Sequence, residues 1–435
     1  MTGRPVKPGI AERAAALDHL LRVFRDRRML ADDSRARAGR NLDPAERAAA
    51  KRLAHSVLRR SDSLDEVLSP YLKRRPPLKI HLILKIVAAE ILLGKTQGYA
   101  AVDCGVELSR RVSAVSGHHG MVNAVGRRMA RDRDVIAPTG RLRPNALPSP
   151  LFREIDDRLG QDAVSRIERA HARPAPLDLT PRDRDARPDL AESLGAVVLP
   201  TGTLRISSPQ GQVSGLPGYD EGLWWVQDAA AALAVPCLGP VRGNRVLDVC
   251  AAPGGKTMQL AAAGAILTAV DKSPSRLRRL KANLRRTGLA ARTIAADALT
   301  WDPDSQFDVV LIDPPCTATG TMRRHPELQF IRDLDRIDDL VSLQAELLDR
   351  AAGWVSPGGR LVMSTCSLFS AEGEEQADRF LHRHAGWVIE SPFDTLPGVP
   401  EDWMLPTGAL RTRPDYWEKR GGMDGFFIAR FRRLR

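Results

Sequence analysis

Two cysteines in this chain each follow an apolar run and could do chemistry. Cys316 stands in IDPPCTATG, three positions after Asp313, and Cys366 stands in MSTCS. A thiolate is a strong nucleophile, and a nearby carboxylate can take part in proton transfer. The alternative is that both are small core residues, the usual fate of a free cysteine. We adopt the chemical interpretation for this pair and expect Cys104 and Cys237 to lie in the core.

Both cysteines belong to a region, from Gly243 on, in which predicted strands and helices alternate. Near-continuous apolar strands with helices between them predict a doubly wound, mostly parallel sheet. The predicted strands cover residues 245–250, 265–271, 291–297, 307–313 and 359–365. Four of them end at or near an aspartate, at Asp248, Asp271, Asp297 and Asp313. Ligands bind outside the carboxyl ends of strands in such sheets, so these acids predict a ligand site.

The loop after the first of these strands has the features of a cofactor site. In LDVCAAPGGKT, the pair Gly254 and Gly255 lets the backbone approach a ligand closely. Asp271 ends the next strand, 23 residues after Asp248, where an acid can accept both ribose hydroxyls of an adenosine group. The loop is neither GxGxxG nor a phosphate-binding loop. An ordinary turn followed by a strand-end acid is the alternative, and the two further acids count against it.

These motifs resemble those of the RNA 5-cytosine methyltransferases that use S-adenosylmethionine, the NOL1/NOP2/Sun family. DVCAAPGGKT closely matches their cofactor loop. The chain is most similar to the bacterial small-subunit rRNA branch of the Sun/RsmB (Fmu) type, in which a NusB-like helical domain precedes the catalytic domain. GLWWVQDAAA before the sheet and DGFFIARF near the end support this branch. The resemblance covers nearly the whole chain and is weakest over residues 136–220.

The resemblance implies a role for each residue of the cofactor site. The loop would cradle the methionine end of the cofactor with Cys250, Ala251, Ala252, Pro253, Gly254, Gly255 and Lys256. Asp271 would hold the ribose, and Asp297 would lie by the adenine amino group. Asp313 would contribute to the cofactor site at the same edge of the sheet and would also hydrogen-bond the target cytosine.

The family's reaction explains a need for two thiols. Carbon 5 of cytosine is a poor nucleophile, and a covalent bond from a thiolate to carbon 6 makes it reactive toward the sulfonium methyl group. The family assigns this attack to the Thr-Cys cysteine, here Cys366, and implicates the Pro-Pro-Cys cysteine, here Cys316, in product release. The target base must be single-stranded or flipped out, which suits an rRNA loop.

Two loops depart from the family's usual pattern. Pro-Pro-Cys is usually followed by Ser-Gly-Thr-Gly, where residues 317–320 read Thr-Ala-Thr-Gly, so an altered loop path is expected. Pro-Glu-Glu-Asn usually follows the Thr-Cys motif, where residues 369–375 read Phe-Ser-Ala-Glu-Gly-Glu-Glu. Neither change removes a reacting group. The nearby TMRRHPE segment, residues 321–327, is either a contact for backbone phosphates or a surface loop.

The excess positive charge of the chain lies in its first third. The chain has 65 Lys and Arg against 53 Asp and Glu, a formal charge of +12, and residues 1–135 alone hold 27 against 15. This asymmetry is typical of a nucleic-acid-binding module, although an arginine-rich solvated surface is the alternative. The same region reads as helical, with a capping box from Asp43 to Glu46. The apolar run from Leu78 to Gly94 predicts the buried centre of a helical bundle.

Four parts of the chain follow from these patterns. We expect a NusB-like helical RNA-binding domain over 1–135, a linker over 136–150, a small mixed α/β subdomain over 151–235 and the methyltransferase domain over 236–435. AVVLPTGTLRIS in the third part predicts a hairpin. The sequence has neither a long apolar run nor the apolar core of a signal peptide, which predicts a cytoplasmic protein. The chain has five cysteines and no CxxC pair, which argues against a metal site and against disulfides. We expect a monomer that binds RNA, with small-subunit rRNA as the expected substrate.

Three other functions remain to be weighed. Transfer RNA is the main rival substrate for the same chemistry. A non-catalytic RNA-binding or ribosome-assembly scaffold would not need both thiols and four strand-end acids. DNA cytosine methyltransferases use a Pro-Cys loop for attack and lack the paired Thr-Cys motif, which counts against that class.

Overall fold

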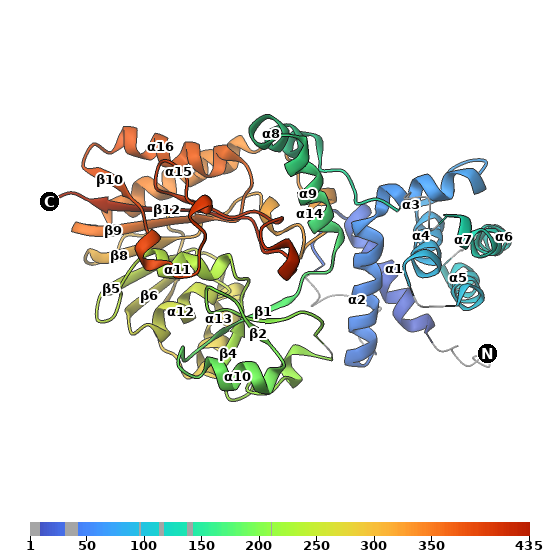
Figure 1. The fold of residues 1–435 in the computed structure, drawn as a ribbon, viewed down its shortest axis with the longest axis horizontal. Helices are drawn as coiled ribbons and strands as arrows, with labels where there is room; N and C mark the ends of the chain where they lie inside the picture. Colours follow the sequence, from blue (N-terminus) through green and yellow to red (C-terminus); the bar gives the residue numbers. More distant parts are fainter. Residues whose placement is uncertain (1–8, 31–41, 95–96, 113–116, 137–141, 210) are drawn as a thin grey trace. The chain divides into compact units, whose positions relative to one another are not determined.

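The computed structural model describes residues 9–30, 42–94, 97–112, 117–136, 142–209 and 211–435 (Figure 1). The chain forms two compact units, and each is treated by itself. The helical unit comprises Met1–Pro148, His171–Arg173 and Arg324–Arg332. The sheet unit comprises Ser149–Ala170, Pro174–Arg323 and Asp333–Arg435.

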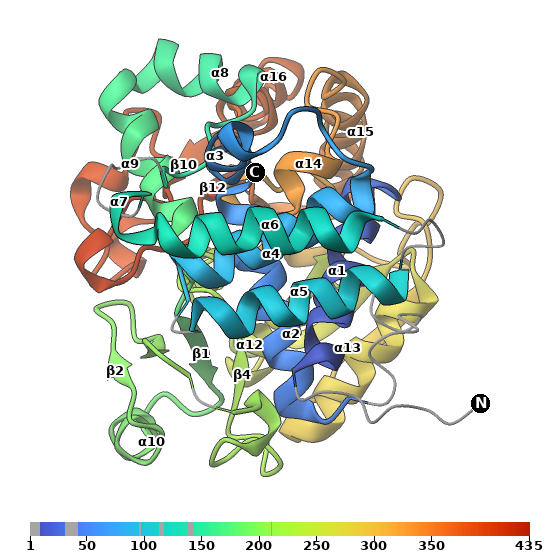
Figure 2. The ribbon, with the colours of Figure 1, turned by 90° about the vertical axis from the view of Figure 1, so that its right-hand side faces the viewer.

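The helical unit is a bundle of α-helices around one apolar core. Its helices are α1 (Ile10–Phe24), α2 (Pro44–Arg59), α3 (Ser61–Leu68), α4 (Leu78–Leu92), α5 (Gly98–Val112), α6 (His118–Arg131), α7 (Arg133–Ile136) and α14 (Leu328–Ile331). Nearly all of α4 is buried, which confirms the predicted central helix. The capping box of α2 is also confirmed, because Asp43 Oδ1 accepts from Glu46 N and Glu46 Oε2 accepts from Asp43 N, both at 2.8 Å. Helices α5 and α6 run side by side (Figure 2).

A segment distant in sequence completes the core of the helical unit. Residues 324–332 belong to this unit, although they follow the Pro-Pro-Cys loop in the chain. The ring of Phe330 lies 4.8 Å from the ring of Phe24, and Glu327 Oε1 accepts a hydrogen bond from Leu30 N at 3.3 Å. The helical unit is therefore assembled from separate stretches of the sequence.

The sheet unit contains a large sheet whose central strands are parallel. Its order is β10-β12-β9-β8-β5-β6-β7, with β11 pairing β12. The strands are β5 (Arg245–Val249), β6 (Ile266–Asp271), β7 (Arg292–Ala295), β8 (Phe307–Ile312), β9 (Val355–Thr365), β10 (Trp387–Glu390), β11 (Leu410–Arg411) and β12 (Phe427–Arg433). All five predicted strands are confirmed, and β5 to β9 pair in parallel. The antiparallel additions β10, β11 and β12 were not predicted.

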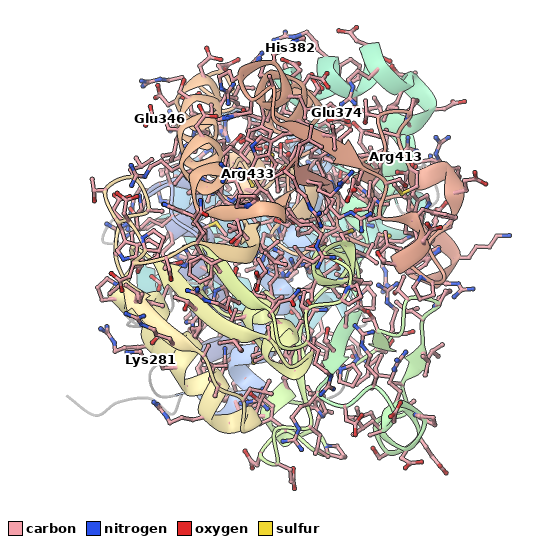
Figure 3. The ribbon with its side chains drawn as sticks, turned by 90° about the vertical axis from the view of Figure 1, so that its left-hand side faces the viewer. Lys281, Glu346, Glu374, His382, Arg413 and Arg433 are labelled. Atoms are coloured by element: carbon pink, nitrogen blue, oxygen red, sulfur yellow. The ribbon has the colours of Figure 1, made fainter. Side chains whose placement is uncertain are left out.

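Helices cover both faces of this sheet because alternate strand residues point to opposite sides. Val246 packs in the core that α11 and α12 cover, whereas Leu247 packs in the core that α15 and α16 cover. Figure 3 shows the strands between α15, which carries Glu346, and α13, which carries Lys281. The helices are α11 (Ala234–Cys237), α12 (Gly255–Ala262), α13 (Pro274–Thr287), α15 (Asp338–Gly353) and α16 (Glu374–Arg383). The predicted doubly wound fold is confirmed.

A second, smaller antiparallel sheet lies in the same unit, in the order β2-β3-β1-β4. Its strands are β1 (Leu177–Pro181), β2 (Val197–Val198), β3 (Leu204–Ile206) and β4 (Trp224–Val226). The predicted hairpin is confirmed, since β2 pairs with β3. Helix α10 (Arg187–Leu194) packs against this sheet. Helices α8 (Ser149–Leu159) and α9 (Gln161–Ala172) precede β1 in the chain.

The described residues contain neither a membrane-spanning helix nor a cluster of metal ligands. No helix there combines the length and apolar character needed to span a bilayer. No group of three or more histidine, cysteine or acidic side chains in the same ranges is arranged to hold a metal ion.

Candidate active site

Three loops leave one edge of the large sheet next to one another. Strand β5 lies between β6 and β8, and β8 lies beside β9. Val249 of β5 pairs with Ile312 of β8, and Ile312 pairs with Met363 of β9. Since the strands are parallel, the glycine loop, the Pro-Pro-Cys loop and the Thr-Cys loop all start at the carboxyl edge. The chain also reverses its direction of winding at β5, which is where such sheets bind ligands.

The two thiols meet at this edge. Cys316 Sγ and Cys366 Sγ lie 3.4 Å apart, although the residues are 50 positions apart in sequence. Cys316 is buried and Cys366 is half-buried. The hydrogen bond to Cys366, burial, and the charges of Glu372 and Asp313 raise the pKa of Cys316 well above its usual value. Cys316 is therefore a neutral thiol that can donate its S–H to the sulfur of Cys366.

A buried ammonium group lies beside the thiols. Lys256, near the start of α12, donates a hydrogen bond to Asp313 Oδ2 at 2.7 Å. Burial opposes its charge, but the carboxylate of Asp313 and the charge of Cys366 raise its pKa. The Lys256–Asp313 ion pair holds the Asp313 side chain in place at the carboxyl end of β8. Sequence reasoning placed Lys256 in the cofactor loop but missed its ion pair with Asp313, because that pair depends on the pairing of β5 with β8.

One strand-end acid has an oxygen with no hydrogen-bond partner among the described residues. Thr257 Oγ1 donates to Asp248 Oδ2 at 2.6 Å, while Asp248 Oδ1 is buried and accepts no hydrogen bond within the described chain. Burial raises the pKa of Asp248 to about 7. An acceptor left open beneath the glycine loop fits a ligand that brings a hydrogen-bond donor or a positive charge.

The glycine loop is held in a shape that only small residues allow. Gly254 has a φ of 107°, and a Cβ there would lie 2.9 Å from Leu280 Cγ. Asp271 is buried, and it accepts hydrogen bonds from Ala252 N at 3.1 Å and Ser273 N at 2.9 Å. Each carboxylate oxygen keeps a further lone pair, so Asp271 can still accept from ribose hydroxyls.

The remaining predicted residues have distinct environments. Asp297 is exposed and accepts a hydrogen bond from Leu299 N at 3.0 Å. Burial raises the pKa of the Cys250 thiol to about 12, which disfavours its thiolate form. Cys104 and Cys237 are buried, as expected for core residues. Ala318 has a φ of 58°, a left-handed conformation at the position where the family usually has glycine.

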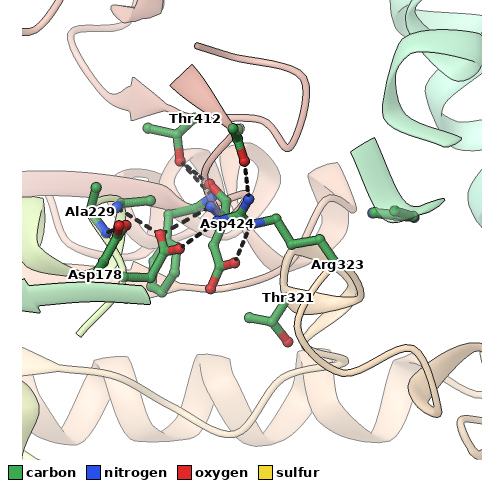
Figure 4. A network of polar contacts seen from close by, with 12 residues as sticks. Asp178, Ala229, Thr321, Arg323, Thr412 and Asp424 are labelled. Atoms are coloured by element: carbon green, nitrogen blue, oxygen red, sulfur yellow. Dashed lines mark hydrogen bonds and ion pairs between the residues drawn. The ribbon is translucent and has the colours of Figure 1, made fainter. Parts of the chain in front are cut away.

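The phosphate contact proposed for the TMRRHPE segment is wrong for Arg323. This side chain is buried, with Nη2 3.3 Å from Asp228 Oδ2 and Nε 3.2 Å from Asp424 Oδ1 (Figure 4). Buried arginines need such partners, since an unpaired buried charge is very costly. Neither of the two interpretations made from the sequence, phosphate contact or surface loop, applies to Arg323.

A glycine loop at the winding reversal, with acids at the ends of the neighbouring strands, defines the class of S-adenosylmethionine-dependent methyltransferases. Comparison with known proteins narrows this class. Residues 235–432 match the family described as 16S rRNA methyltransferase RsmB/F, and residues 11–131 match the NusB family.

Relatives match along almost the whole chain. The ribosomal RNA small subunit methyltransferase B of Xylella fastidiosa (strain Temecula1) is 33% identical, over 97% of this chain and 98% of its own. The protein of the same name from Erwinia tasmaniensis is 31% identical, over 90% of this chain and 92% of its own. The crystal structure of PH0851 has the same fold, with a TM-score of 0.73 at 23% identity over 99% of this chain and 100% of that one. The chain belongs to the 16S rRNA methyltransferase RsmB/F family and is an S-adenosylmethionine-dependent RNA methyltransferase.

Proposed function

We propose that this enzyme methylates carbon 5 of a cytosine in small-subunit rRNA through a covalent bond between Cys366 and carbon 6. The observation that carries the proposal is the 3.4 Å separation of the Cys316 and Cys366 sulfurs beside the Lys256–Asp313 pair. When bound, S-adenosylmethionine supplies the methyl group as a sulfonium electrophile. The route needs no metal ion and no second subunit, because one chain supplies both thiols.

Each side chain of the site has a step in this reaction. The Cys366 thiolate attacks carbon 6, and Asp313 accepts a hydrogen bond from the exocyclic amino group of cytosine. Lys256 can donate to ring nitrogen 3, where electron density accumulates as the carbon–sulfur bond forms.

Release of the product depends on the protonation of the Cys316 thiol. The hydrogen bond with Cys366 is the largest cause of the raised pKa of Cys316. Once Cys366 is bonded to carbon 6 as a thioether, it is a much weaker hydrogen-bond acceptor, so the Cys316 thiol becomes easier to deprotonate and gives its proton to solvent. Its thiolate can then take the proton from carbon 5, and the electron pair of that bond expels Cys366 from carbon 6.

The cofactor would be held by the glycine loop and the strand-end acids. Residues 250–256 would surround its methionine end, with Asp248 beneath the loop, Asp271 at the ribose and Asp297 toward the adenine. The basic NusB-like part would bind RNA, and the enzyme would act where ribosomal subunits assemble, in the cytoplasm.

Substitution of each thiol tests the proposal. Cys366→Ala should abolish methyl transfer to unmodified small-subunit rRNA while S-adenosylmethionine still binds. Cys316→Ala should accumulate an RNA–protein adduct on a denaturing gel, and the double variant should lose it. Methyl transfer by Cys366→Ala would overturn the assignment of the nucleophile. Bisulfite sequencing of the product locates the cytosine, and a preference for tRNA in the same assay would overturn the rRNA assignment.

A further inference from the structure

A buried carboxylate lies beneath the two thiol loops and contacts both of them. Glu372 ends the short 3-10 helix Ser370–Glu372 and is fully buried. Its Oε2 accepts from Thr317 Oγ1 at 2.6 Å and from Ser367 Oγ at 2.5 Å. Its Oε1 accepts from Thr317 N at 3.0 Å and from Gln344 Nε2 at 2.9 Å. Thr317 directly follows Cys316, and Ser367 directly follows Cys366.

Further hydrogen bonds tie the same two loops to each other. The hydroxyl oxygens of Thr317 and Ser367 lie 3.1 Å apart, and Thr319 Oγ1 accepts from Leu368 N at 2.9 Å. Thr365, the last residue of β9, donates its hydroxyl to the main-chain oxygen of Glu372 at 2.9 Å. Glu372 is thus the common acceptor at the centre of a network that spans the Pro-Pro-Cys and Thr-Cys loops.

The charge of Glu372 is held by hydrogen bonds alone in the described part of the chain, where it forms no ion pair. Hydrogen bonds to a buried carboxylate are strong, and removing one partner is costly. The network therefore resists relative movement of the loops. The same charge contributes to the raised pKa of Cys316, so it helps to keep that thiol protonated before the nucleophile reacts.

We propose that Glu372 is a positioning residue for catalysis: it bridges the residues that follow Cys316 and Cys366 and so sets the separation of the two sulfur atoms. The proposal rests on the proposed function, since it concerns the geometry of that reaction. Displacements of about 1 Å in an active site can lower rates roughly a hundredfold. Glu372 touches neither the base nor the cofactor in this role and acts only through the loops.

Replacement by glutamine is the sharpest test, because it keeps the shape and removes the charge and one acceptor. Glu372→Gln should lower kcat for methyl transfer about tenfold to a hundredfold. The KM for RNA and the affinity for S-adenosylmethionine should change little. Glu375→Gln is the matched control, because Glu375 is in the same segment but accepts hydrogen bonds from Arg379 and Ser370, which lie outside the network. Equal kcat values for the two variants would overturn the proposal.

Thiol reactivity gives a second readout that does not depend on turnover. Alkylation of each cysteine by iodoacetamide, followed by mass spectrometry across pH, reports the pKa of each thiol in the absence of RNA. In Glu372→Gln the profile of Cys316 should shift to lower pH, while Glu375→Gln should match the unaltered enzyme. An unshifted profile would overturn the proposal, whatever the effect on kcat.

A second pair of variants removes the donors and leaves Glu372 in place. If Glu372→Gln does not fold, Thr317→Val and Ser367→Ala carry the test, and each should lower kcat at unchanged cofactor affinity. Unchanged kcat in both would overturn the proposal. The alkylation readout does not use RNA, so it is independent of the thiol substitutions that test the proposed function.

Discussion

At the scale of single residues, Asp248 carries a charge that its surroundings do not favour. Its pKa in the folded chain is about 7, and burial is the main cause. In the unfolded chain the carboxyl group has its ordinary pKa, near 3.9. Between these values the folded chain binds more protons than the unfolded chain, so the contribution of Asp248 to stability falls as pH rises through this window.

Replacing Asp248 by asparagine should therefore stabilise the sheet unit more at pH 8 than at pH 5. The expected gain in the free energy of unfolding between these pH values, relative to the unaltered protein, is on the order of 2 kcal/mol. All seven tryptophans of the chain lie in the sheet unit, so their fluorescence reports its unfolding. An identical difference between the two proteins at both pH values would contradict the prediction.

Sequence patterns could find the proposed reacting groups but not the groups that hold them. Cys316, Cys366 and Asp313 were predicted because each follows an apolar strand, and the order of strands in a doubly wound sheet brings their loops together. Glu372 was noticed only as part of a departure from the family pattern. Its partners come from three separate segments, so only the folded chain shows them in contact.

At the scale of elements, the Pro-Pro-Cys loop is held against the segment that precedes β12. Gly425 N donates to Gly320 O at 2.8 Å, and a Cβ on Gly320 would lie 2.0 Å from Gly425 O. Gly320 N also donates to Cys366 O at 3.0 Å, which ties the two thiol loops together. Glycine is therefore required at this position by contact between two backbones.

Gly320→Ala should displace the loop and lower both stability and kcat. Forcing atoms into a packed region usually costs about 1–3 kcal/mol, and the thiols move with the loop. Gly353→Ala, at the end of α15, is the control, because nothing lies within 4 Å of the added Cβ. Thermal unfolding and a methyl-transfer assay of both variants check this, and a Gly320→Ala enzyme that behaves like the control would refute it.

The elements that sequence reasoning missed depend on distant partners. Strand β1 lies in a passage rich in proline and arginine, and its Asp178 forms a two-pronged salt bridge with Arg205 of β3. Arg323 looked like a surface charge, but the fold brings Asp228 and Asp424 to it from 95 and 101 residues away. Such long-range pairings cannot be predicted from local hydrophobic patterns, whereas the parallel strands can.

At the scale of the whole molecule, the charge asymmetry of the sequence has a structural counterpart. A groove of about 870 Å³ in the helical unit is lined by α5 and α6. Its lining includes the exposed ring of Tyr99 and the side chains of Arg110, Arg127, Arg128 and Arg131. Arginines beside an exposed aromatic ring are suited to single-stranded RNA, because arginines pair with its phosphates and its bases stack on aromatic rings.

Reversing two of these charges, with Arg127→Glu and Arg131→Glu together, should weaken RNA binding. The salt dependence should flatten by a slope of roughly 0.7 for each single-strand phosphate that the double variant no longer binds. Lys51→Glu with Arg52→Glu, exposed on α2, makes the same charge change outside the groove. Fluorescence anisotropy at several salt concentrations compares the pairs, and equal weakening would show that the groove has no special part in binding.

The contribution of residues 324–332 to the helical unit limits how this enzyme can be rearranged. A truncation that removes the first third of the chain would leave Phe330 without Phe24, and Glu327 without the backbone of Leu30. A chimaera that exchanges only the amino-terminal third of the chain would keep the original residues 324–332. Those residues would then pack against helices to which they are not matched. We therefore expect working hybrids only when this short stretch is transplanted together with the amino-terminal helices it packs against.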